Sequence, residues 1–196
     1  MPKYSIIIPA HNDEARIIKA LESIKAQTVT DYELIVICDA CDDKTEEISR
    51  SYGAITKAVN YHRDGLSRNA GLDMATGEWV LFMDSDDWWL HEYVIETLDN
   101  ITAQRDFDIL CFGFVWRGVG ITEQTNRIWP NVWSKLWRRS AIGSTRFNGK
   151  WSVSDMDFTN AMLRKPGIRV MSWDQALYYY NYMRPGSITE TDRRCK

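Results

Sequence analysis

An apolar run that ends abruptly in acidic residues has the clearest chemical meaning in the sequence: Trp79-Val80-Leu81-Phe82-Met83-Asp84-Ser85-Asp86-Asp87. Five large side chains in succession are typical of a strand buried on both faces of a parallel sheet. Open α/β sheets bind ligands at the carboxyl ends of such strands. Two carboxylates one residue apart repel each other, and Mg²⁺ or Mn²⁺ bound to phosphate oxygens would relieve that repulsion. The motif predicts either a divalent-cation site for a phosphate-bearing ligand or a solvated Asp-rich turn.

Polar groups follow two other predicted strands and should meet these acids at the same edge of the sheet. They are Ala10-His11-Asn12, and Asp39 with Asp42 and Asp43. A helix start at Gly65–Gly71 adds Arg68, which suits an anion or a nucleobase carbonyl. Such loops could hold a base, a ribose and a metal-bridged diphosphate. The sequence contains neither G-x-G-x-x-G after the first strand nor G-x-x-x-x-G-K-[ST], which argues against dinucleotide oxidoreduction and P-loop hydrolysis.

Strand and helix patterns alternate through the first half of the chain and would position these loops. Strands are predicted at Tyr4–Ile8, Tyr32–Cys38, Ile55–Val59, Trp79–Met83 and Phe107–Phe112. Helices are predicted at Asp13–Ala26, with Asn12 or Asp13 as N-cap, and at Asp43–Tyr52, Gly65–Thr76 and His91–Ala103. This order is typical of an α/β fold with a parallel sheet and right-handed crossovers.

The second half of the chain loses this alternation. Gly113–Pro130 is polar and is predicted to be irregular. Two further helices are predicted at Asn131–Ile142 and Val153–Leu163, and two late strands at Arg169–Trp173 and Ala176–Tyr182. Because no Gly/Ser linker, internal repeat or low-complexity segment divides the 196 residues, we expect a single domain over 1–196.

Composition and charge exclude several classes of protein. A net charge of −3 gives no reason to expect nucleic-acid binding. Pro9 stops the short run Ile6-Ile7-Ile8, so no signal peptide is predicted, and no segment approaches the ~20 apolar residues of a membrane helix. We therefore expect a cytoplasmic protein without a transmembrane segment. A peripheral membrane contact and a homo-oligomer are both compatible with this composition.

The four cysteines are Cys38, Cys41, Cys111 and Cys195. The first two form a C-x-x-C motif, but a zinc site would need a second pair of ligands, which the three histidines are not spaced to provide. A thioredoxin-like role is disfavoured because the acids after Cys41 oppose a thiolate. We interpret Cys38 as a buried strand end and Cys41 as a loop residue, both reduced.

Seven segments in order give the chain its resemblance to a known family. They are Ser5-Ile-Ile-Ile-Pro-Ala-His-Asn12, Ile37-Cys-Asp-Ala-Cys-Asp-Asp43, Ser67-Arg-Asn-Ala-Gly71, Phe82-Met-Asp-Ser-Asp-Asp87, Trp133-Ser-Lys-Leu-Trp-Arg-Arg139, Ser154-Asp-Met-Asp-Phe158 and Tyr180-Asn-Tyr-Met-Arg-Pro-Gly-Ser-Ile-Thr189. Together they resemble family 2 glycosyltransferases. The resemblance implies a single-domain, Rossmann-like A-type glycosyltransferase fold, with a mainly parallel central sheet flanked by helices. About 1–112 would be the nucleotide-sugar-binding half and about 113–196 the acceptor-binding half.

The resemblance also implies roles for particular residues. Asp39 matches the acid that hydrogen-bonds a uracil N–H, although an Asx turn is the alternative. Arg68 matches a residue near the base or phosphate, and a solvated helix arginine is the alternative. Pro9, His11 and Asn12 match the loop that flanks the base; His11 could equally be a loop histidine with its hydrogen bonds satisfied, so no catalytic role is assigned to it. Asp84 and Ser85 match positions beside the nucleotide sugar, with Asp84 near the ribose. Asp86 matches the ligand of Mn²⁺ or Mg²⁺ on the diphosphate, and Asp87 would support it.

The general base of the family is carried by a Glu-Asp pair in many members, and Ser154-Asp155 stands at that position. Asp155 is therefore the expected catalytic residue and Asp157 its rival, but residues two apart on a helix point to different faces. Ala40-Cys41 replaces the usual Gly-Ser, a second departure from the pattern. Lys135 and Arg184 could offset diphosphate charge, or each could simply be exposed. Among nine tryptophans, Trp88, Trp89 and Trp151 are candidates for stacking on a sugar.

These expectations describe an inverting, metal-dependent transferase that moves a sugar from a nucleoside diphosphate to an acceptor hydroxyl. The expected donor is a UDP-sugar. The acceptor would be a carbohydrate, a lipid-linked molecule or another hydroxyl compound. Two alternatives stay open. A nucleotidyltransferase would share the sheet and the acids but should carry a Gly-rich basic loop where Ala10-His11-Asn12-Asp13 stands. A catalytically silent module would bind the UDP-sugar without forming product.

Overall fold

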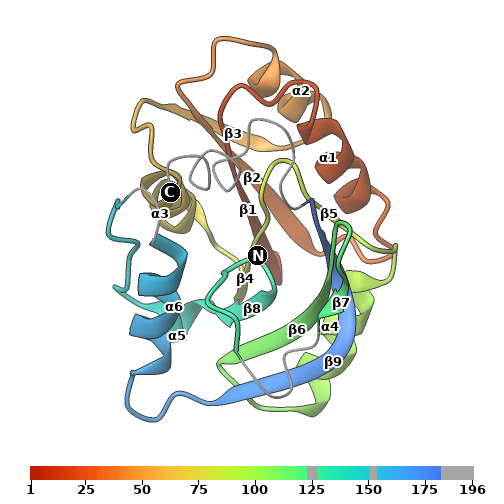
Figure 1. The fold of residues 1–196 in the computed structure, drawn as a ribbon, viewed down its shortest axis with the longest axis vertical. Helices are drawn as coiled ribbons and strands as arrows, with labels where there is room; N and C mark the ends of the chain where they lie inside the picture. Colours follow the sequence, from red (N-terminus) through yellow and green to blue (C-terminus); the bar gives the residue numbers. More distant parts are fainter. Residues whose placement is uncertain (123–127, 151–153, 182–196) are drawn as a thin grey trace.

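The computed structural model describes residues 1–122, 128–150 and 154–181, which are built around one nine-stranded sheet (Figure 1). Its strand order is β3-β2-β1-β4-β8-β6-β9-β5, and β7 pairs with β6. The strands are β1 (Tyr4–Ala10), β2 (Tyr32–Asp39), β3 (Ile55–Val59), β4 (Trp79–Phe82), β5 (Trp88–Trp89), β6 (Ile109–Trp116), β7 (Gly120–Thr122), β8 (Lys135–Arg138) and β9 (Val170–Tyr180). The predicted single α/β domain is confirmed.

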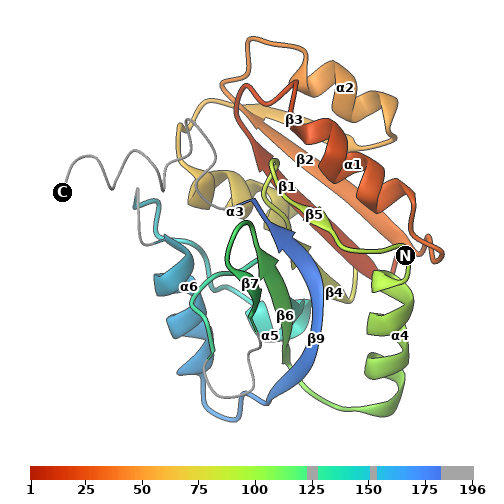
Figure 2. The same cartoon turned by 45° about the vertical axis from the view of Figure 1, so that its right-hand side comes forward.

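Helices cover both faces of this sheet, as Figure 2 shows. They are α1 (Ile17–Lys25), α2 (Thr45–Ser51), α3 (Asp64–Met74), α4 (Val94–Gln104), α5 (Arg139–Ile142) and α6 (Ser154–Leu163). Side chains of α1 and α4 join one buried apolar cluster, against which α2 also packs. Side chains of α3, α5 and α6 join a second cluster on the opposite face. Side chains alternate between the two faces of a strand, so Ile6 and Ile8 contribute to the first cluster and Ile7 to the second.

The first four strands are parallel, and they end at one edge of the sheet. In the register, Tyr4 pairs with Tyr32 on one side and with Trp79 on the other. Every residue of β1 and β4 is buried, as the unbroken apolar runs predicted. Pairing between β1 and β4 ends at Ile7 and Phe82. The segments after β1, β2 and β4 therefore emerge together, and the predicted site loops share one edge.

The helix predicted at Asn131–Ile142 is wrong. Its residues form β8 and then the short helix α5. β8 lies between β4 and β6 and is antiparallel to both. Because both faces of β8 are covered, Lys135, Leu136 and Trp137 are all buried. A strand buried on both faces shows no alternation, so periodicity could not distinguish it from a helix.

Other boundaries also differ from the predictions. α1 begins at Ile17 instead of Asp13, and its N-cap is Arg16, not Asn12 or Asp13. The Asp13 side chain contacts Ser85 and Arg16. The two late strands form one strand, β9, which pairs in parallel with β6 and has register shifts near Gly113. β6 continues to Trp116, into a region predicted to be irregular, and β7 follows it.

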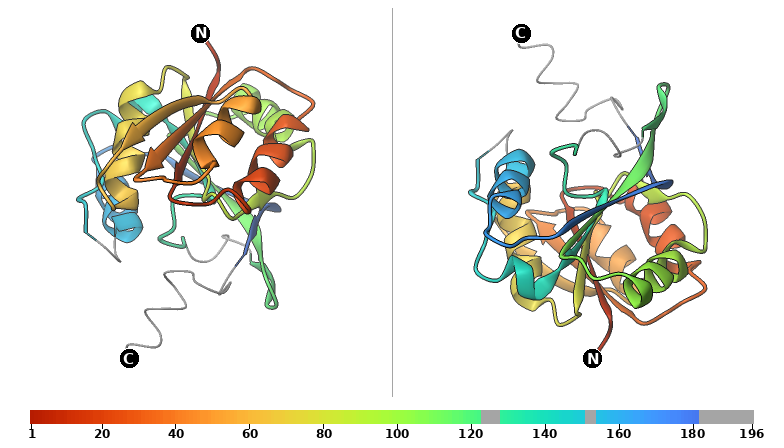
Figure 3. Two further views of the ribbon diagram at one scale, coloured as in Figure 1. Left: turned by 90° about the horizontal axis from the view of Figure 1, so that it is seen from above. Right: turned by 90° about the horizontal axis from the view of Figure 1, so that it is seen from below.

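The strands β6 and β7 form a hairpin that extends away from the body of the protein (Figure 3). Val119 and Ile121 near its tip are among the most exposed apolar residues of the described chain. No helix in the described ranges is long and apolar enough to span a membrane.

Candidate active site

Arg68 on α3 binds two carboxylates at the edge where β1, β2 and β4 end. Its Nη2 lies 2.6 Å from Asp84 Oδ1, just after β4, and its Nη1 lies 3.2 Å from Asp155 Oδ1 on α6. The Arg68 side chain is only 5% exposed, whereas those of Asp84 and Asp155 are 27% and 29% exposed. A buried guanidinium thus orients two acids that a ligand can still reach, one from each half of the chain.

Gly65 allows α6 to approach α3 closely enough for this contact. A β-carbon at residue 65 would lie 2.1 Å from the Ser154 Oγ and 3.0 Å from the Phe147 Cβ, so a larger residue would force these side chains to shift. The rings of Phe147 and Phe158 stack beside this point, with centroids 4.1 Å apart. The Ser that replaces the usual Glu at position 154 is buried in this contact. Its small size therefore suits the close packing of α6 on α3.

Three consecutive residues of α3 connect the site loops to one another. Ser67 donates a hydrogen bond to Asp39 Oδ2 at 2.9 Å. Arg68 binds the two acids, and Asn69 exchanges hydrogen bonds of 2.8 and 2.9 Å with the backbone of Phe147. Because α3 also packs against β1, with Gly71 directly over Ile7, these contacts fix the loops relative to the sheet.

Negative charge is concentrated after β4. Burial, together with Asp155 and Asp86 nearby, raises the pKa of Asp84 to about 7 despite the opposing charge of Arg68. Burial also raises the pKa of Asp87 well above its ordinary value. Asp87 accepts hydrogen bonds from the Tyr178 hydroxyl at 2.7 Å and from the Asn181 backbone N–H at 2.8 Å. Such a group of acids would be relieved by a bound cation.

The carboxylates that follow β4 suit a cation that takes most of its ligands from a substrate. Among the described residues, no group of three or more His, Cys, Asp or Glu side chains could hold a metal ion by itself. Asp84 is engaged by Arg68 and Asp87 by Tyr178, while Asp86 is half-buried in the same turn. Mg²⁺ and Mn²⁺ sites of this kind use one or two carboxylates and complete their shell with phosphate oxygens and water.

The predicted base-binding residue Asp39 is surrounded by hydrogen-bond donors. Its Oδ1 accepts from the backbone N–H groups of Tyr61 at 2.6 Å and His62 at 2.9 Å, and its Oδ2 accepts from Arg63 at 2.9 Å and from Ser67. Burial alone would raise the pKa of Asp39, but these hydrogen bonds outweigh it and leave the pKa below its ordinary value. The carboxylate therefore joins the end of β2 to the start of α3.

Strained backbone gathers around Asp39. Asn12, Ala40 and His62 have φ angles of +50°, +52° and +50°, in the left-handed region. His11 Nδ1 lies 2.6 Å from the Asp39 carbonyl oxygen, and the ring of His11 meets that of His62 edge-on. Left-handed backbone is costly for a residue with a β-carbon and persists where surrounding contacts enforce it, as at binding sites. Ala40, which stands where Gly is usual, keeps the turn despite that cost.

The other residues predicted to bind the nucleotide sugar lie at the same edge of the sheet but differ in exposure. Pro9 is buried within β1, in register with Ile37. Asn12 accepts a 2.9 Å hydrogen bond from the Asp42 backbone N–H. Ser85 is buried and donates its hydroxyl hydrogen to Asp13, so that hydroxyl supports the loop after β1.

The structure separates the two candidates for the general base. Asp155 lies against Arg68, whereas Asp157 forms an exposed ion pair with Lys150 at 3.1 Å and accepts a hydrogen bond from Asn148. The two carboxylates therefore have different surroundings, as expected for positions two apart on a helix.

Lys135 has no access to a diphosphate. It is fully buried, and its ammonium donates to the carbonyl oxygens of Trp129 and Asn131, each at 2.6 Å, and to Asn131 Oδ1 at 3.2 Å. Burial lowers the pKa of Lys135 to about 8. The suggestion that Lys135 offsets phosphate charge is not supported by this geometry. Arg184, the other cation suggested for that role, lies outside the described residues.

Two of the three tryptophans proposed for sugar stacking are already covered. Trp89 is buried in the core. Trp88 has the Tyr179 ring stacked at 4.1 Å and the Lys19 ammonium 3.2 Å from its centroid. Two groups this close to one centroid must lie on opposite faces, so both faces of Trp88 are occupied. Trp151 lies outside the described residues.

Sequence reasoning missed several residues that hold the site together. The Tyr178 hydroxyl accepts from the Asp84 backbone N–H at 3.1 Å as well as donating to Asp87. Asp13 accepts from Ser85, and Asn181 contacts both Asp86 and Asp87. Tyr178 stands in a run of three tyrosines, and nothing in the sequence distinguishes it from its neighbours.

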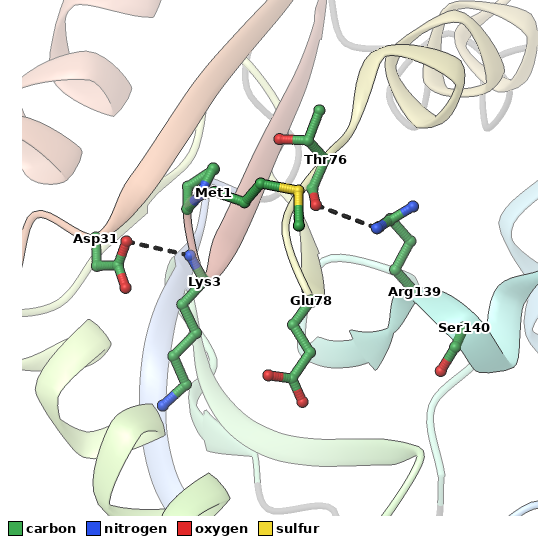
Figure 4. A pocket seen from close by; sticks show the side chains of 8 residues that line it. Met1, Lys3, Asp31, Thr76, Glu78, Arg139 and Ser140 are labelled. Atoms are coloured by element: carbon green, nitrogen blue, oxygen red, sulfur yellow. Dashed lines mark hydrogen bonds between the residues drawn. The ribbon is translucent and has the colours of Figure 1, made fainter.

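A cavity of about 510 Å³ lies at the opposite edge of the sheet, near the amino ends of β1 and β4 (Figure 4). Polar groups along it are already paired: the Lys3 backbone N–H donates to Asp31 at 3.2 Å and the Arg139 guanidinium to the Thr76 carbonyl at 3.1 Å. None of the predicted site residues lines it. We therefore assign the chemistry to the acidic edge.

Comparisons with known proteins agree with this geometry. The model of the family described as "Glycosyl transferase family 2" matches residues 5–170. An uncharacterized glycosyltransferase of Haemophilus influenzae is 35% identical over 96% of this chain and 71% of its own length. The crystal structure of Staphylococcus aureus TarS 1-349 in complex with UDP-GlcNAc is 25% identical, has a TM-score of 0.85, and is matched over 96% of this chain and 61% of that one.

A more distant structure shares the fold. Glucosyl-3-phosphoglycerate synthase from Mycobacterium tuberculosis, solved with Mn²⁺ and UDP, has a TM-score of 0.72 at 18% identity, over 97% of this chain and 75% of that one. The chain spans 50% and 64% of the length of two Bacillus subtilis glycosyltransferases that it also matches.

Proposed function

Since this chain belongs to glycosyl transferase family 2, we propose that it transfers a sugar from a UDP-sugar to an acceptor hydroxyl with inversion at the anomeric carbon. The observation that carries the proposal is the contact of Arg68 with Asp84 and Asp155. This contact joins a residue predicted to bind the nucleotide sugar to the predicted general base. A structure of TarS holding UDP-GlcNAc at 25% identity supports the choice of donor. The half at about 1–112 would bind the donor and that at about 113–196 the acceptor.

Recognition of the nucleotide is assigned to the strained turn around Asp39. His11 and Asn12 flank the base in this proposal, with Pro9 supporting them from β1. The Asp39 carboxylate has donors at both oxygens, so a contact to the uracil N–H requires one of the 61–63 backbone groups to move away. Asp84 and Ser85 would face the ribose and diphosphate, with Arg68 holding Asp84 in place.

The diphosphate would be held together with Mn²⁺ or Mg²⁺, for which Asp86 is the proposed protein ligand. When bound, such a cation stabilises the negative charge that grows on the leaving diphosphate. The Mn²⁺ in the structure of glucosyl-3-phosphoglycerate synthase supports a divalent metal without choosing between the two ions. Asp87, buried and bound to Tyr178, would keep the turn that carries Asp86 in shape.

Asp155 is proposed as the general base. Its carboxylate would take the proton of the acceptor hydroxyl as that oxygen forms a bond to the anomeric carbon and the bond from that carbon to the diphosphate oxygen breaks. One displacement without an enzyme nucleophile inverts the configuration. Arg68 contacts Asp155 from the buried side and leaves part of the carboxylate exposed to an acceptor. The acceptor would be a carbohydrate, a lipid-linked molecule or another hydroxyl compound.

Binding of UDP should require the cation, because the acids after β4 would otherwise repel the diphosphate. We expect calorimetric titration with UDP to give a clear binding heat with Mn²⁺ and little heat with a chelator. Asp86→Asn should reproduce the chelator result while keeping its thermal midpoint near that of the wild type. Asp174→Asn, a change at an exposed acid on β9, is the matched control and should bind UDP normally. Equal UDP affinity with Mn²⁺ and with chelator would contradict the metal assignment.

A further inference from the structure

Cys38 and Cys41 both lie beside Ala10, the last residue of β1. Cys38 pairs with Ala10 in the register between β1 and β2. The chain turns back after β2, and the Cys41 Sγ donates a hydrogen bond to the Ala10 carbonyl oxygen at 3.4 Å. Cys38 is buried in the same apolar cluster against which Cys41 packs, so both side chains lie on one face of the sheet. Both thiols are free, and the left-handed residue Ala40 forms the turn that brings Cys41 back.

The surroundings of Cys41 favour its thiolate, which corrects the expectation that the acids after Cys41 prevent one. Hydrogen bonding from Cys38 is the largest influence and lowers the pKa of Cys41 to about 7, with further help from the Asn12 backbone N–H and from His11, against the opposing effects of burial and of Asp43. The same hydrogen bond, with burial, raises the pKa of Cys38. A partly exposed thiolate beside a protonated, buried thiol resembles the arrangement of redox-active cysteine pairs.

We propose that Cys38 and Cys41 form a reversible intramolecular disulfide when the chain meets a hydroperoxide. The Cys41 thiolate attacks a peroxide oxygen, the O–O bond breaks, and Cys41 becomes a sulfenic acid while hydroxide (or alkoxide) leaves. The Cys38 sulfur then attacks the Cys41 sulfur. The S–O bond breaks, and the departing hydroxide takes the Cys38 proton to give water. The peroxide is reduced by two electrons and the two thiols are oxidised to one disulfide.

This disulfide would close the turn that carries Asp39 and Ala40, beside the contacts of His11 and Asn12. A change in nucleotide binding on oxidation follows only if the proposed function holds. Disulfide formation itself depends on the two sulfur atoms alone. The two ideas can therefore fail separately.

Peptide mapping of the full chain tests the disulfide directly. Cleavage after Lys25 and Lys44 places both cysteines in one tryptic peptide, 26–44, while Cys111 lies in the separate peptide 106–117. After treatment of the folded chain with hydrogen peroxide and alkylation under denaturing conditions, we expect peptide 26–44 to lose two hydrogen atoms and take no alkyl group. Peptide 106–117 should keep its alkyl group. A thiol reductant should restore two alkyl groups to 26–44.

Variants distinguish the roles of the two sulfur atoms. Cys38→Ser should leave the Cys41 sulfenic acid without a partner, so dimedone should label 26–44 in this variant. Cys41→Ser, at the less buried position, should abolish both the disulfide and the dimedone label. Cys111→Ser should behave as the wild type. Two alkyl groups on 26–44 after peroxide in the wild type, or a cross-link from this peptide to Cys195, would overturn the proposal even if Cys38→Ser does not fold.

Discussion

Replacing Asp155 by Asn is expected to lower the rate of sugar transfer by at least about a hundredfold, the low end of what a positioned general base contributes. The Asn side chain keeps the size of Asp and can still accept a hydrogen bond from Arg68, but it cannot take a proton from the acceptor. Affinity for the UDP-sugar and for Mn²⁺ should stay near that of the wild type, because Asp155 lies on α6, in the half of the chain that we propose binds the acceptor. Steady-state rates and calorimetric donor titrations on the same samples check both halves of this result.

Asp157→Asn is the matched control on the same helix. Asp157 pairs with Lys150 away from Arg68, so its loss should leave transfer close to the wild-type rate. The reverse pattern in the two variants would assign the base to Asp157. Full activity in both variants would remove the general base from α6 altogether.

Replacing Arg68 by Met is expected to reduce the free energy of unfolding by about 3 kcal/mol, the lower end of the range for breaking a buried ion pair. Met fills much of the same space, but it leaves Asp84 and Asp155 facing each other without the cation that separates them. Because both acids retain some contact with water, we expect a loss of unfolding free energy at the lower end of that range. Urea denaturation of the wild type and the variant measures the loss.

Arg146→Met provides the control for removing an arginine from an ion pair. Arg146 pairs with Asp73 at 2.8 Å, but both side chains are exposed, and such pairs contribute about 0–1 kcal/mol. Adding Asp84→Asn to Arg68→Met should restore part of the lost stability, since it removes one of the two opposing charges. Equal losses in Arg68→Met and Arg146→Met, or no recovery in the double variant, would show that Arg68 does not balance the acids.

Much of the site proposed to bind the nucleotide sugar could be predicted from local sequence. Apolar runs that end in polar residues located β1, β2 and β4, and their parallel order brought the loops after them to one edge. Local sequence is sufficient here because strands buried on both faces are apolar and ligands bind at the carboxyl ends of such strands. The match of the family model over residues 5–170 confirms the resemblance.

The contacts that complete the site depend on distant parts of the chain. Arg68 meets Asp155 only because Gly65 and Ser154 pack closely, and Tyr178 reaches Asp84 and Asp87 only because β9 passes beside β5. No periodicity or spacing encodes these pairings. For the same reason, Lys135 was considered for diphosphate binding or for an exposed position, whereas β8 carries it into the middle of the sheet.

Release of UDP from a panel of nucleotide sugars, measured with the wild-type chain in Mn²⁺ and in chelator, decides whether this chain is a UDP-sugar-dependent transferase. We expect that at least one UDP-sugar releases UDP, that Mn²⁺ is required, and that guanine and adenine nucleotide sugars react more slowly. Binding of UDP-sugars with no UDP released from any of them would identify a silent binding module. Release of pyrophosphate in place of UDP, in the presence of a nucleoside triphosphate and a sugar phosphate, would identify a nucleotidyltransferase and contradict the account.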